Sequence, residues 1–472
     1  MNTQAGTHTK PRTGEMGNPL GTLPVNTLLR RFAIPSIVAM LVNSLYNIVD
    51  QFFIGHGVGA LGNAATSISF PLTICCLSIA LLLGIGGASA FNLEMGAGNR
   101  ETAGYYIGNA ASVMLIGGVL LTAIALLFSR PLLLFFGSPQ DVLDHALVYM
   151  RTCACGYPAA ILAAGGAHLV RADGSPNMTM LINVAGAVTN TILDALFVFV
   201  FHWGMFGAAF ATVIGQVLSA TLVLVYLAHY KTVPLSLKHF KPQAEYAVRA
   251  ASLGTASCIT QLSLMVFQIV MNNSLKYYGQ FSVYGSSIPI ACVGIITKVS
   301  QVAFAFIIGI SQGMQPIASF NYGAKQYDRV RNVYRLAIRA GAVVAVIAGV
   351  LFLTFPRQII AIFGEGSNEY FAFGVLYFRV YLMLFFLCFM TPLTSNFFTA
   401  IGKPKNGTFL SLTRQIIFLV PLILILPLFF QIDGILYAGP IADGMAFIAS
   451  VLMIRREFQR PEWHGGAAQG NA

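Results

Sequence analysis

Long, nearly uninterrupted apolar segments recur along the whole chain, with short polar segments between them. Each apolar segment reaches the roughly 20 residues that an α-helix needs to cross the hydrocarbon core of a bilayer. The segments do not alternate apolar and polar positions as barrel strands do, so the pattern predicts spanning helices. The expected spans are residues 28–54, 60–92, 103–128, 142–168, 177–201, 205–229, 245–275, 284–316, 330–354, 369–398, 406–430 and 435–454.

The composition supports this interpretation. Of the 472 residues, 56% are hydrophobic and 9% are charged, with a mean hydropathy of +0.74, whereas about 25% of residues are charged in a typical soluble domain. The predicted fold class is therefore an all-α polytopic membrane protein with twelve transmembrane helices. Residues 1–27 are polar and contain proline and glycine, so we expect an irregular N-terminal tail without a cleavable signal peptide.

The two halves of the chain resemble each other. The segment FSRPLLLFFG at 128–137 matches FPRQIIAIFG at 355–364, and ALVYMR ending at Arg151 matches GVLYFR ending at Arg379. Six spans in each half keep the same sidedness, which predicts two six-helix bundles related by a pseudo-twofold axis along the membrane normal. The predicted domains are an N-terminal tail (1–27), an N-terminal bundle (28–230), a linker (231–243), a C-terminal bundle (244–456) and a C-terminal tail (457–472).

Lysine and arginine residues are distributed unevenly between the two sides. If the N-terminus is cytoplasmic, twenty of the 27 basic residues fall on the cytoplasmic side, five on the other side, and Lys298 and Arg414 within spans. This asymmetry predicts a multi-pass protein of the cell inner membrane with both termini in the cytoplasm. Basic loops that face anionic lipid headgroups also account for the net charge of +11, so membrane lipid is the expected partner and nucleic acid is not.

The chain lacks the motifs that an enzyme or an ATP-driven pump would need. It contains no HExxH, no P-loop and no GxSxG with catalytic partners, so we expect neither an enzyme nor a cofactor. Its seven cysteines all fall within spans without metal-binding spacing. A duplicated bundle is typical of secondary transporters, which makes an ion gradient the expected energy source. Two other functions are alternatives. A membrane-embedded transferase would need paired acidic residues on a cytoplasmic loop. A passive channel would need no pair of carboxylates inside one bundle.

Three acidic residues, Asp50, Asp194 and Asp443, lie within spans. Insertion of such a residue costs about 2.5–3.5 kcal/mol, so each marks a candidate functional site. The carboxylates of the first and fifth spans each end a polar stripe on one helix face. The stripes consist of Asn43, Tyr46, Asn47 and Asp50 in the first span and of Asn183, Asn190 and Asp194 in the fifth.

Both stripes belong to spans that run outward, so the two carboxylates lie near one depth, level with Thr212 of the sixth span. Such an oxygen-rich pocket suits a proton shared by two close carboxylates, or Na⁺ held by the oxygens of Asp50, Asn190, Asp194 and Thr212. The residue pattern leaves the choice between these ions open. A polar seam that only packs helices is the remaining interpretation.

Together these motifs resemble the multidrug and toxic compound extrusion (MATE) family of efflux transporters. The matching segments are YNIVDQFFIG at 46–55, NTILD at 190–194, GAAFATVIGQ at 207–216 and GISQGMQPIASFNYGA at 309–324, and the resemblance extends from Leu28 to Arg456. It implies two V-shaped bundles and export of organic, often cationic, drugs against an inward flow of H⁺ or Na⁺. By position, the implied ion-coupling residues are Tyr46, Asp50, Asn190, Asp194 and Thr212.

The C-terminal half carries Lys298, Gln301, Arg414 and Asp443 within its spans. Arg414 and Asp443 lie at similar depth in consecutive helices, and an ion pair would offset much of the cost of burying them; the alternative is a role in drug binding or in switching between states. The candidates for substrate contact or gating are Asn43, Asn47, Asn183, Lys298, Gln301, Arg414 and Asp443.

We therefore expect a secondary active multidrug exporter that works by alternating access. Its expected partners are small-molecule organic drugs or cations and membrane lipid, and one chain is expected to function as a monomer. A flippase for a lipid-linked precursor, from the same exporter superfamily, is the alternative. A flippase would predict a basic central cavity for pyrophosphate, and the chain places only two basic residues within spans.

Overall fold

The computed structural model describes residues 18–136, 138–285, 287–362 and 367–463. Within these residues the chain is helical and contains no strand. Eleven helices are long and apolar enough to cross a membrane. A bent pair, Asn368–Val380 and Phe385–Ala400, whose axes differ by 41°, makes a twelfth. The prediction of an all-α protein with twelve spans is therefore confirmed.

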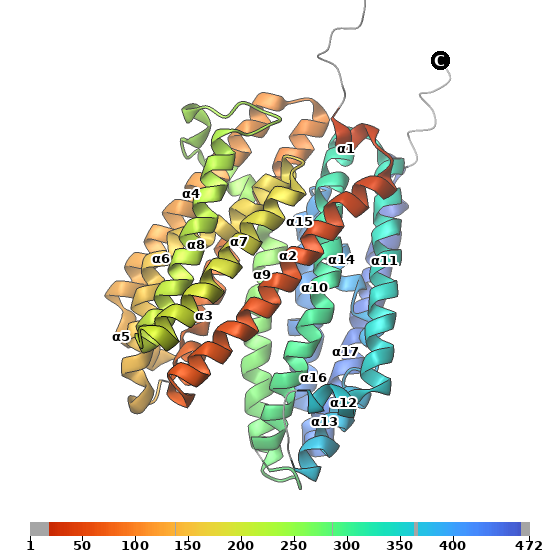
Figure 1. Ribbon diagram of the computed structural model, residues 1–472. Helices are drawn as coiled ribbons and strands as arrows, with labels where there is room; N and C mark the ends of the chain where they lie inside the picture. The colour runs from red at the N-terminus through yellow and green to blue at the C-terminus, as the bar shows by residue number, and fades with distance from the viewer. Residues whose placement is uncertain (1–17, 137, 286, 363–366, 464–472) are drawn as a thin grey trace, which may run out of the picture.

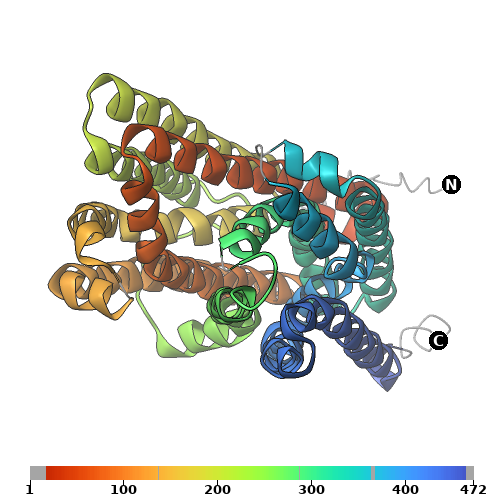
Figure 2. The same ribbon diagram turned by 90° about the horizontal axis from the view of Figure 1, so that it is seen from below.

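The helices form two lobes, drawn in red to yellow-green and in green to blue in Figure 1. The N-terminal lobe consists of α2 (Val25–Gly57), α3 (Ala60–Ala97), α4 (Arg100–Leu127), α5 (Ser129–Phe135), α6 (Gln140–Ala172), α7 (Pro176–Asp194) with the π-helix η1 (Ala195–Val200), and α8 (Gly204–Ala228). After the short 3₁₀ helix η2 (Leu237–Phe240), the C-terminal lobe consists of α9 (Ala244–Gly279), α10 (Ser287–Gly323), α11 (Tyr327–Thr354), α12 (Pro356–Ala361), α13 (Asn368–Val380), η3 (Phe385–Leu387), α14 (Met390–Ala400), α15 (Pro404–Leu412), the π-helix η4 (Thr413–Leu419), α16 (Val420–Ile425) and α17 (Pro427–Phe458). In Figure 2 the red to yellow helices gather on one side and the cyan to blue helices on the other.

Both described ends of the chain lie at the same end of the molecule, which we call the terminal end (Figure 1). Residues 18–27 are not the irregular tail that the sequence predicts, because they form α1 (Pro19–Thr22) and the start of α2. Leu20 is buried, and Arg329 Nη2 donates hydrogen bonds to the carbonyl oxygens of Leu20 and Leu23 at 3.1 and 2.7 Å. These contacts fix the segment against the C-terminal lobe. Residues 1–17 lie outside the described residues.

The other predicted tail is also partly ordered. Residues 457 and 458 still belong to α17, and the 3₁₀ helix η5 (Pro461–Trp463) follows it. Glu457 and Trp463 are buried, because the indole packs among aromatic rings of α10, α11, α14 and α17. Residues 464–472 lie outside the described residues.

The boundary between the last two spans also differs from the prediction. The sequence places it at residues 430–435, whereas α16 ends at Ile425 and α17 begins at Pro427. Proline has no backbone N–H to continue a helix, which explains the earlier break. A second irregularity follows at Gln431, whose φ of 51° is not helical.

The two lobes touch through closely approaching backbones in the half of the molecule near the terminal end. A Cβ atom on Gly254 of α9 would lie 1.8 Å from the carbonyl oxygen of Leu82 on α3, and one on Gly313 of α10 would lie 2.6 Å from the backbone nitrogen of Ala33 on α2. Only glycine permits such an approach. We call this contact the glycine seam, formed by Gly86, Gly96, Gly254, Gly309, Gly313 and Gly323. Toward the other end, the helices of the two lobes diverge (Figure 1).

Candidate ion-coupling site

Polar side chains from three helices meet inside the N-terminal lobe. Tyr46 and Asp50 belong to α2, Asn190 and Asp194 to α7, and Thr212 to α8. Asp194 is fully buried and Asn190 is 2% exposed. Asp194 is also the last residue of α7 before the chain widens into the π-helix η1. Single-turn π-helices are frequent at functional sites, because they re-aim side chains within an otherwise regular helix.

A hydrogen-bond chain joins α7 to α8. Asn190 Nδ2 donates to Thr212 Oγ1 at 3.1 Å, and Thr212 Oγ1 donates to the carbonyl oxygen of Ala208 at 3.1 Å. Tyr46 lies close to Asp50, Asp194 and Thr212, and the two carboxylates are neighbours. The structure thus brings together the five residues that the family resemblance implies.

Four oxygen atoms of this site are buried and have no hydrogen-bond partner among the described residues: Asp50 Oδ1, Asn190 Oδ1, and both carboxylate oxygens of Asp194. A buried polar atom without a partner costs about 1–3 kcal/mol, and a buried charge costs more. A proton or a cation at these oxygens would offset this cost. Carboxylate and amide oxygens are the ligands that hard cations such as Na⁺ prefer, and two close carboxylates can equally retain a proton.

Two further residues border this site, and the sequence did not single them out for it. Tyr149 and Cys153 lie one turn apart on α6, near Asp50, and Tyr149 is also near Tyr46. In the sequence, Cys153 is one of seven cysteines that lie within spans without metal-binding spacing. Their spacing of four residues within an apolar span is the only signal in the sequence, because the contact itself depends on how α6 packs against α7 and α8 within the lobe.

The other members of the two polar stripes do not join this site. Asn43 and Asn47 are exposed, and Asn47 Nδ2 donates to the carbonyl oxygen of Asn43 at 2.7 Å. Asn183 Nδ2 donates to the carbonyl oxygen of Thr179 at 2.8 Å, within its own helix. Asn47 and Asn183 therefore bond to their local backbone, and among the described residues no hydrogen bond joins these amides to the carboxylate pair.

In the C-terminal lobe, Arg414 and Asp443 form a buried ion pair, with 2.6 Å between Arg414 Nε and Asp443 Oδ1. The arginine side chain is 16% exposed and the aspartate side chain 1%. Arg414 lies in the π-helix η4, so the fifth span of each lobe contains a π-helix beside a charged residue. Pairing offsets part of the cost of burying both charges, and Asp443 Oδ2 has no hydrogen-bond partner among the described residues.

Lys298 and Gln301 lie in the half of α10 that is remote from the terminal end. Lys298 is half-buried, Gln301 is exposed, and Lys298 forms no ion pair within the described residues. Lys298 precedes Gly309 by eleven residues, about three helical turns. It therefore shares the helix face that meets α2 in the glycine seam.

Comparisons with known proteins agree with this architecture. A family model described as MatE matches residues 35–196 and 256–425. The multidrug export protein MepA of Staphylococcus saprophyticus is 23% identical over 433 residues, which cover 90% of this chain and 92% of that protein. The structure of the MATE multidrug transporter DinF-BH in complex with R6G is 32% identical, with a TM-score of 0.86 over 93% of this chain and 97% of that chain.

A second structure shows the outward-facing conformation of a multidrug resistance MATE family transporter of the MOP superfamily. It is 22% identical to this chain and has a TM-score of 0.86, and the match covers 93% of this chain and 97% of that chain. That likeness supports the fold. The MatE match covers well over half of this chain, and the 32% identical relative covers nearly all of it. The protein therefore belongs to the MATE family of multidrug efflux transporters.

Proposed function

We propose that this protein is a secondary active antiporter that exports lipophilic or cationic organic compounds against an inward flow of H⁺ or Na⁺. The observation that carries the proposal is the set of partnerless buried oxygens on Asp50, Asn190 and Asp194. A proton or Na⁺ on these atoms would neutralise charge at the contact between α2 and α7. Ion binding would thereby change the packing of α2 within the N-terminal lobe, which is the coupling step.

Alternating access would move the two lobes against each other. In the present arrangement the glycine seam closes the half near the terminal end, and the helices diverge at the other end (Figure 1). In the proposed cycle, ion binding at the Asp50 and Asp194 site repacks α2 and releases the drug to the outside. The seam then opens, the ion leaves toward the cytoplasm, and the next drug molecule binds.

The proposed orientation places the terminal end in the cytoplasm, with both chain termini, in the cell inner membrane. The excess of lysine and arginine at that end supports it through the positive-inside rule. One chain contains both lobes, so we propose that the monomer is the functional unit. The complex of the relative DinF-BH with R6G supports an organic cation as substrate.

The test is efflux of the fluorescent organic cation rhodamine 6G from proteoliposomes under an imposed H⁺ or Na⁺ gradient. We expect one of the two gradients to drive export by the wild type, which would name the ion, and Asp50→Asn to abolish that export. Asp433→Asn is the matched control, because Asp433 is an exposed carboxylate outside the site. Equal gradient-driven export by wild type and Asp50→Asn would refute coupling at this site and direct the search to Asp443.

A further inference from the structure

The two lobes turn between their fourth and fifth spans at related positions. The segment 174–176 (Gly-Ser-Pro) makes the turn in the N-terminal lobe, and the segment 402–404 (Gly-Lys-Pro) makes it in the C-terminal lobe. Both glycines have a positive φ, 79° for Gly174 and 75° for Gly402, a conformation that favours glycine. Both turns lie at the terminal end, so their surroundings can be compared directly.

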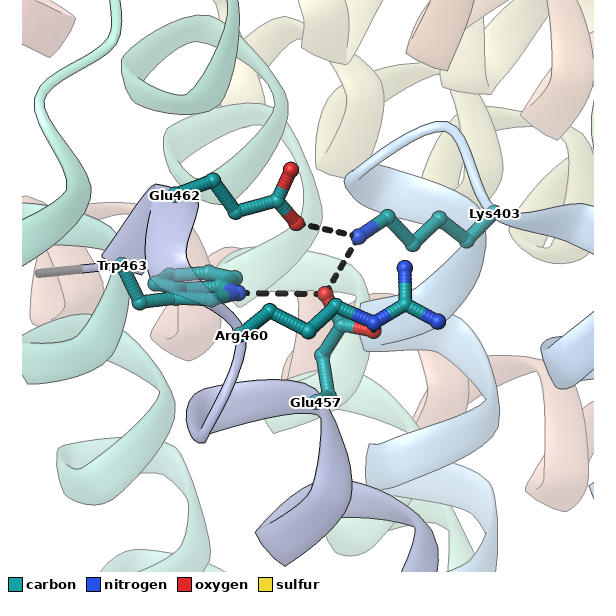
Figure 3. Close-up of polar contacts among 5 residues, drawn as sticks. All are labelled: Lys403, Glu457, Arg460, Glu462 and Trp463. Carbon is teal, nitrogen blue, oxygen red and sulfur yellow. Dashed lines mark hydrogen bonds and ion pairs between the residues drawn. The ribbon is translucent and has the colours of Figure 1, made fainter. Parts of the chain in front are cut away.

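At the turn of the C-terminal lobe, the protein supplies its own carboxylates to the local cation. Lys403 Nζ lies 2.5 Å from both Glu457 Oε1 and Glu462 Oε1, and Trp463 Nε1 donates to Glu457 Oε1 at 3.1 Å (Figure 3). The hydrogen bond from Lys403 lowers the pKa of Glu462 below its usual value, which favours the charged carboxylate. The C-terminal segment thus neutralises and covers this turn.

At the turn of the N-terminal lobe, the corresponding space is open. A cavity of about 370 Å³ lies there, and its lining includes two basic side chains and no carboxylate. Lys231 Nζ donates to Ser175 Oγ at 2.8 Å, and the exposed Arg31 forms no ion pair within the described residues. We call this space the turn cavity; its main lining residues are Arg31, Ser175, Asn177, Met178, Leu181 and Lys231.

The nearest acidic group does not neutralise the turn cavity from within. Asp173 is 4% exposed and is absent from the cavity lining. Its Oδ2 accepts hydrogen bonds from Tyr226 Oη at 2.7 Å and from the backbone nitrogen of Lys231 at 2.8 Å, and its Oδ1 accepts from Thr232. These bonds hold the carboxylate behind the turn. The cavity therefore presents two cations, and the C-terminal lobe shows that carboxylates can fill the related position.

An apolar stripe leads away from the turn cavity along α7. Leu181 lines the cavity and is 53% exposed, and Val188 and Ile192 follow on the same helix face with 50% and 62% exposure. Their spacing of seven and eleven residues from Leu181 keeps them on one side of the helix. An occupant with an anionic head and an apolar tail would satisfy both the cations and the stripe.

We propose that the turn cavity binds the phosphate headgroup of an anionic membrane phospholipid, with an acyl chain along Leu181, Val188 and Ile192. Basic pockets at helix ends bind such headgroups because lipid phosphates and the cations lie at the same depth. The lipid supplies from outside the negative charge that Glu457 and Glu462 supply in the other lobe. It also anchors the N-terminal lobe at the interface, independently of any transport activity.

The test is native mass spectrometry of the delipidated protein titrated with phosphatidylglycerol and, separately, with phosphatidylcholine. We expect a phosphatidylglycerol adduct on the wild type that is at least about tenfold weaker on the double variant Arg31→Gln/Lys231→Gln, given the contribution of each basic residue near a membrane. The matched control Arg455→Gln/Arg456→Gln removes two exposed charges at the same end. It should bind phosphatidylglycerol like the wild type.

A second variant places a carboxylate in the turn cavity. Asn177→Glu imitates the arrangement of the other lobe and should weaken the phosphatidylglycerol adduct while the unfolding temperature of the lipid-free protein stays level or rises. Equal loss of binding in the Arg455/Arg456 control would overturn the proposal, because it would show a general effect of surface charge. Two other results would also overturn the proposal. One is phosphatidylcholine binding as tight as that of phosphatidylglycerol, and the other is displacement of the lipid by inorganic phosphate at similar concentration.

Discussion

Thr212 fixes the geometry of the candidate ion-coupling site although it carries no charge. Its hydroxyl accepts the amide hydrogen of Asn190 and donates to the carbonyl oxygen of Ala208. The first bond holds the Asn190 side chain so that Oδ1, which has no partner among the described residues, remains free beside the carboxylates. The Thr212 hydroxyl can be removed with almost no change in side-chain shape. Its removal therefore tests the positioning of Asn190 separately from the packing of the helices.

We expect Thr212→Val to weaken ion coupling and Thr212→Ser to preserve it. Valine leaves Asn190 Nδ2 without its acceptor in a buried site, at a cost of about 1–3 kcal/mol, and the amide is then free to rotate. The measurement is the ion concentration that gives half-maximal rhodamine 6G efflux from proteoliposomes. It should rise for the valine variant and stay near the wild-type value for serine. Unchanged values for valine would mean that the amide is held by another contact.

At the scale of single residues, the sequence predicts the charged residues of the candidate ion-coupling site better than the uncharged residues around them. Asp50 and Asp194 are conspicuous because a carboxylate within a span is costly. Asn43 and Asn47 share the helical spacing of Asp50, yet their side chains are exposed. The polar stripe of four positions on α2 is wider than the face of α2 that contacts α7. Tyr149 and Cys153 could not be found from the sequence, because their proximity depends on the packing of α6.

At the scale of the helices, close packing between the lobes depends on glycine. Gly254 on α9 and Gly86 on α3 face the opposite backbone, and a Cβ on either would lie 1.8 Å from a carbonyl oxygen. These contacts involve main-chain atoms, which cannot rotate away as a flexible side chain can. The glycines themselves are visible in the sequence, but their positions do not show which of them meet across the two lobes.

We expect Gly254→Ala to force α3 and α9 apart. The added methyl group overpacks a backbone contact, which typically costs about 1–3 kcal/mol. The unfolding temperature of the purified protein and the rate of rhodamine 6G efflux should both fall. Gly294→Ala is the matched control, because a Cβ on Gly294 of α10 meets no atom within 4 Å. If the two alanine variants behave alike, the close approach at the seam carries no such cost.

At the scale of the helices, hydropathy predicts the membrane spans but not the short ordered segments at the two ends of the chain. Hydropathy located all twelve spans because each must cross the apolar core with its backbone satisfied. It missed the order of residues 18–27 and 457–463, since both segments are held by tertiary contacts: the first by Arg329, the second by Lys403 and aromatic rings. Such contacts leave no periodic pattern in the sequence.

For the whole molecule, the proposed cycle requires the glycine seam to open while each lobe keeps its own packing. One polar contact crosses the seam from α10 to α3: Gln315 Nε2 donates to Ser89 Oγ at 2.8 Å. A comparable contact lies within the C-terminal lobe, where the hydroxyls of Ser395 and Ser411 are 2.8 Å apart. The two pairs allow a covalent link either across the seam or within one lobe.

We expect a reducible bis-methanethiosulfonate cross-link between Ser89→Cys and Gln315→Cys to stop rhodamine 6G efflux, and its release by a reducing agent to restore efflux. The link would hold the seam closed, so the cycle could not reach the state that opens toward the terminal end. Ser395→Cys/Ser411→Cys is the matched control, because the same cross-link there joins two helices of one lobe that need not separate. Both pairs are best placed in a protein whose seven free cysteines have been replaced. Undiminished efflux by the fully cross-linked Ser89/Gln315 variant would show that the seam stays closed during transport, and rocking of the lobes would then be excluded as the mechanism.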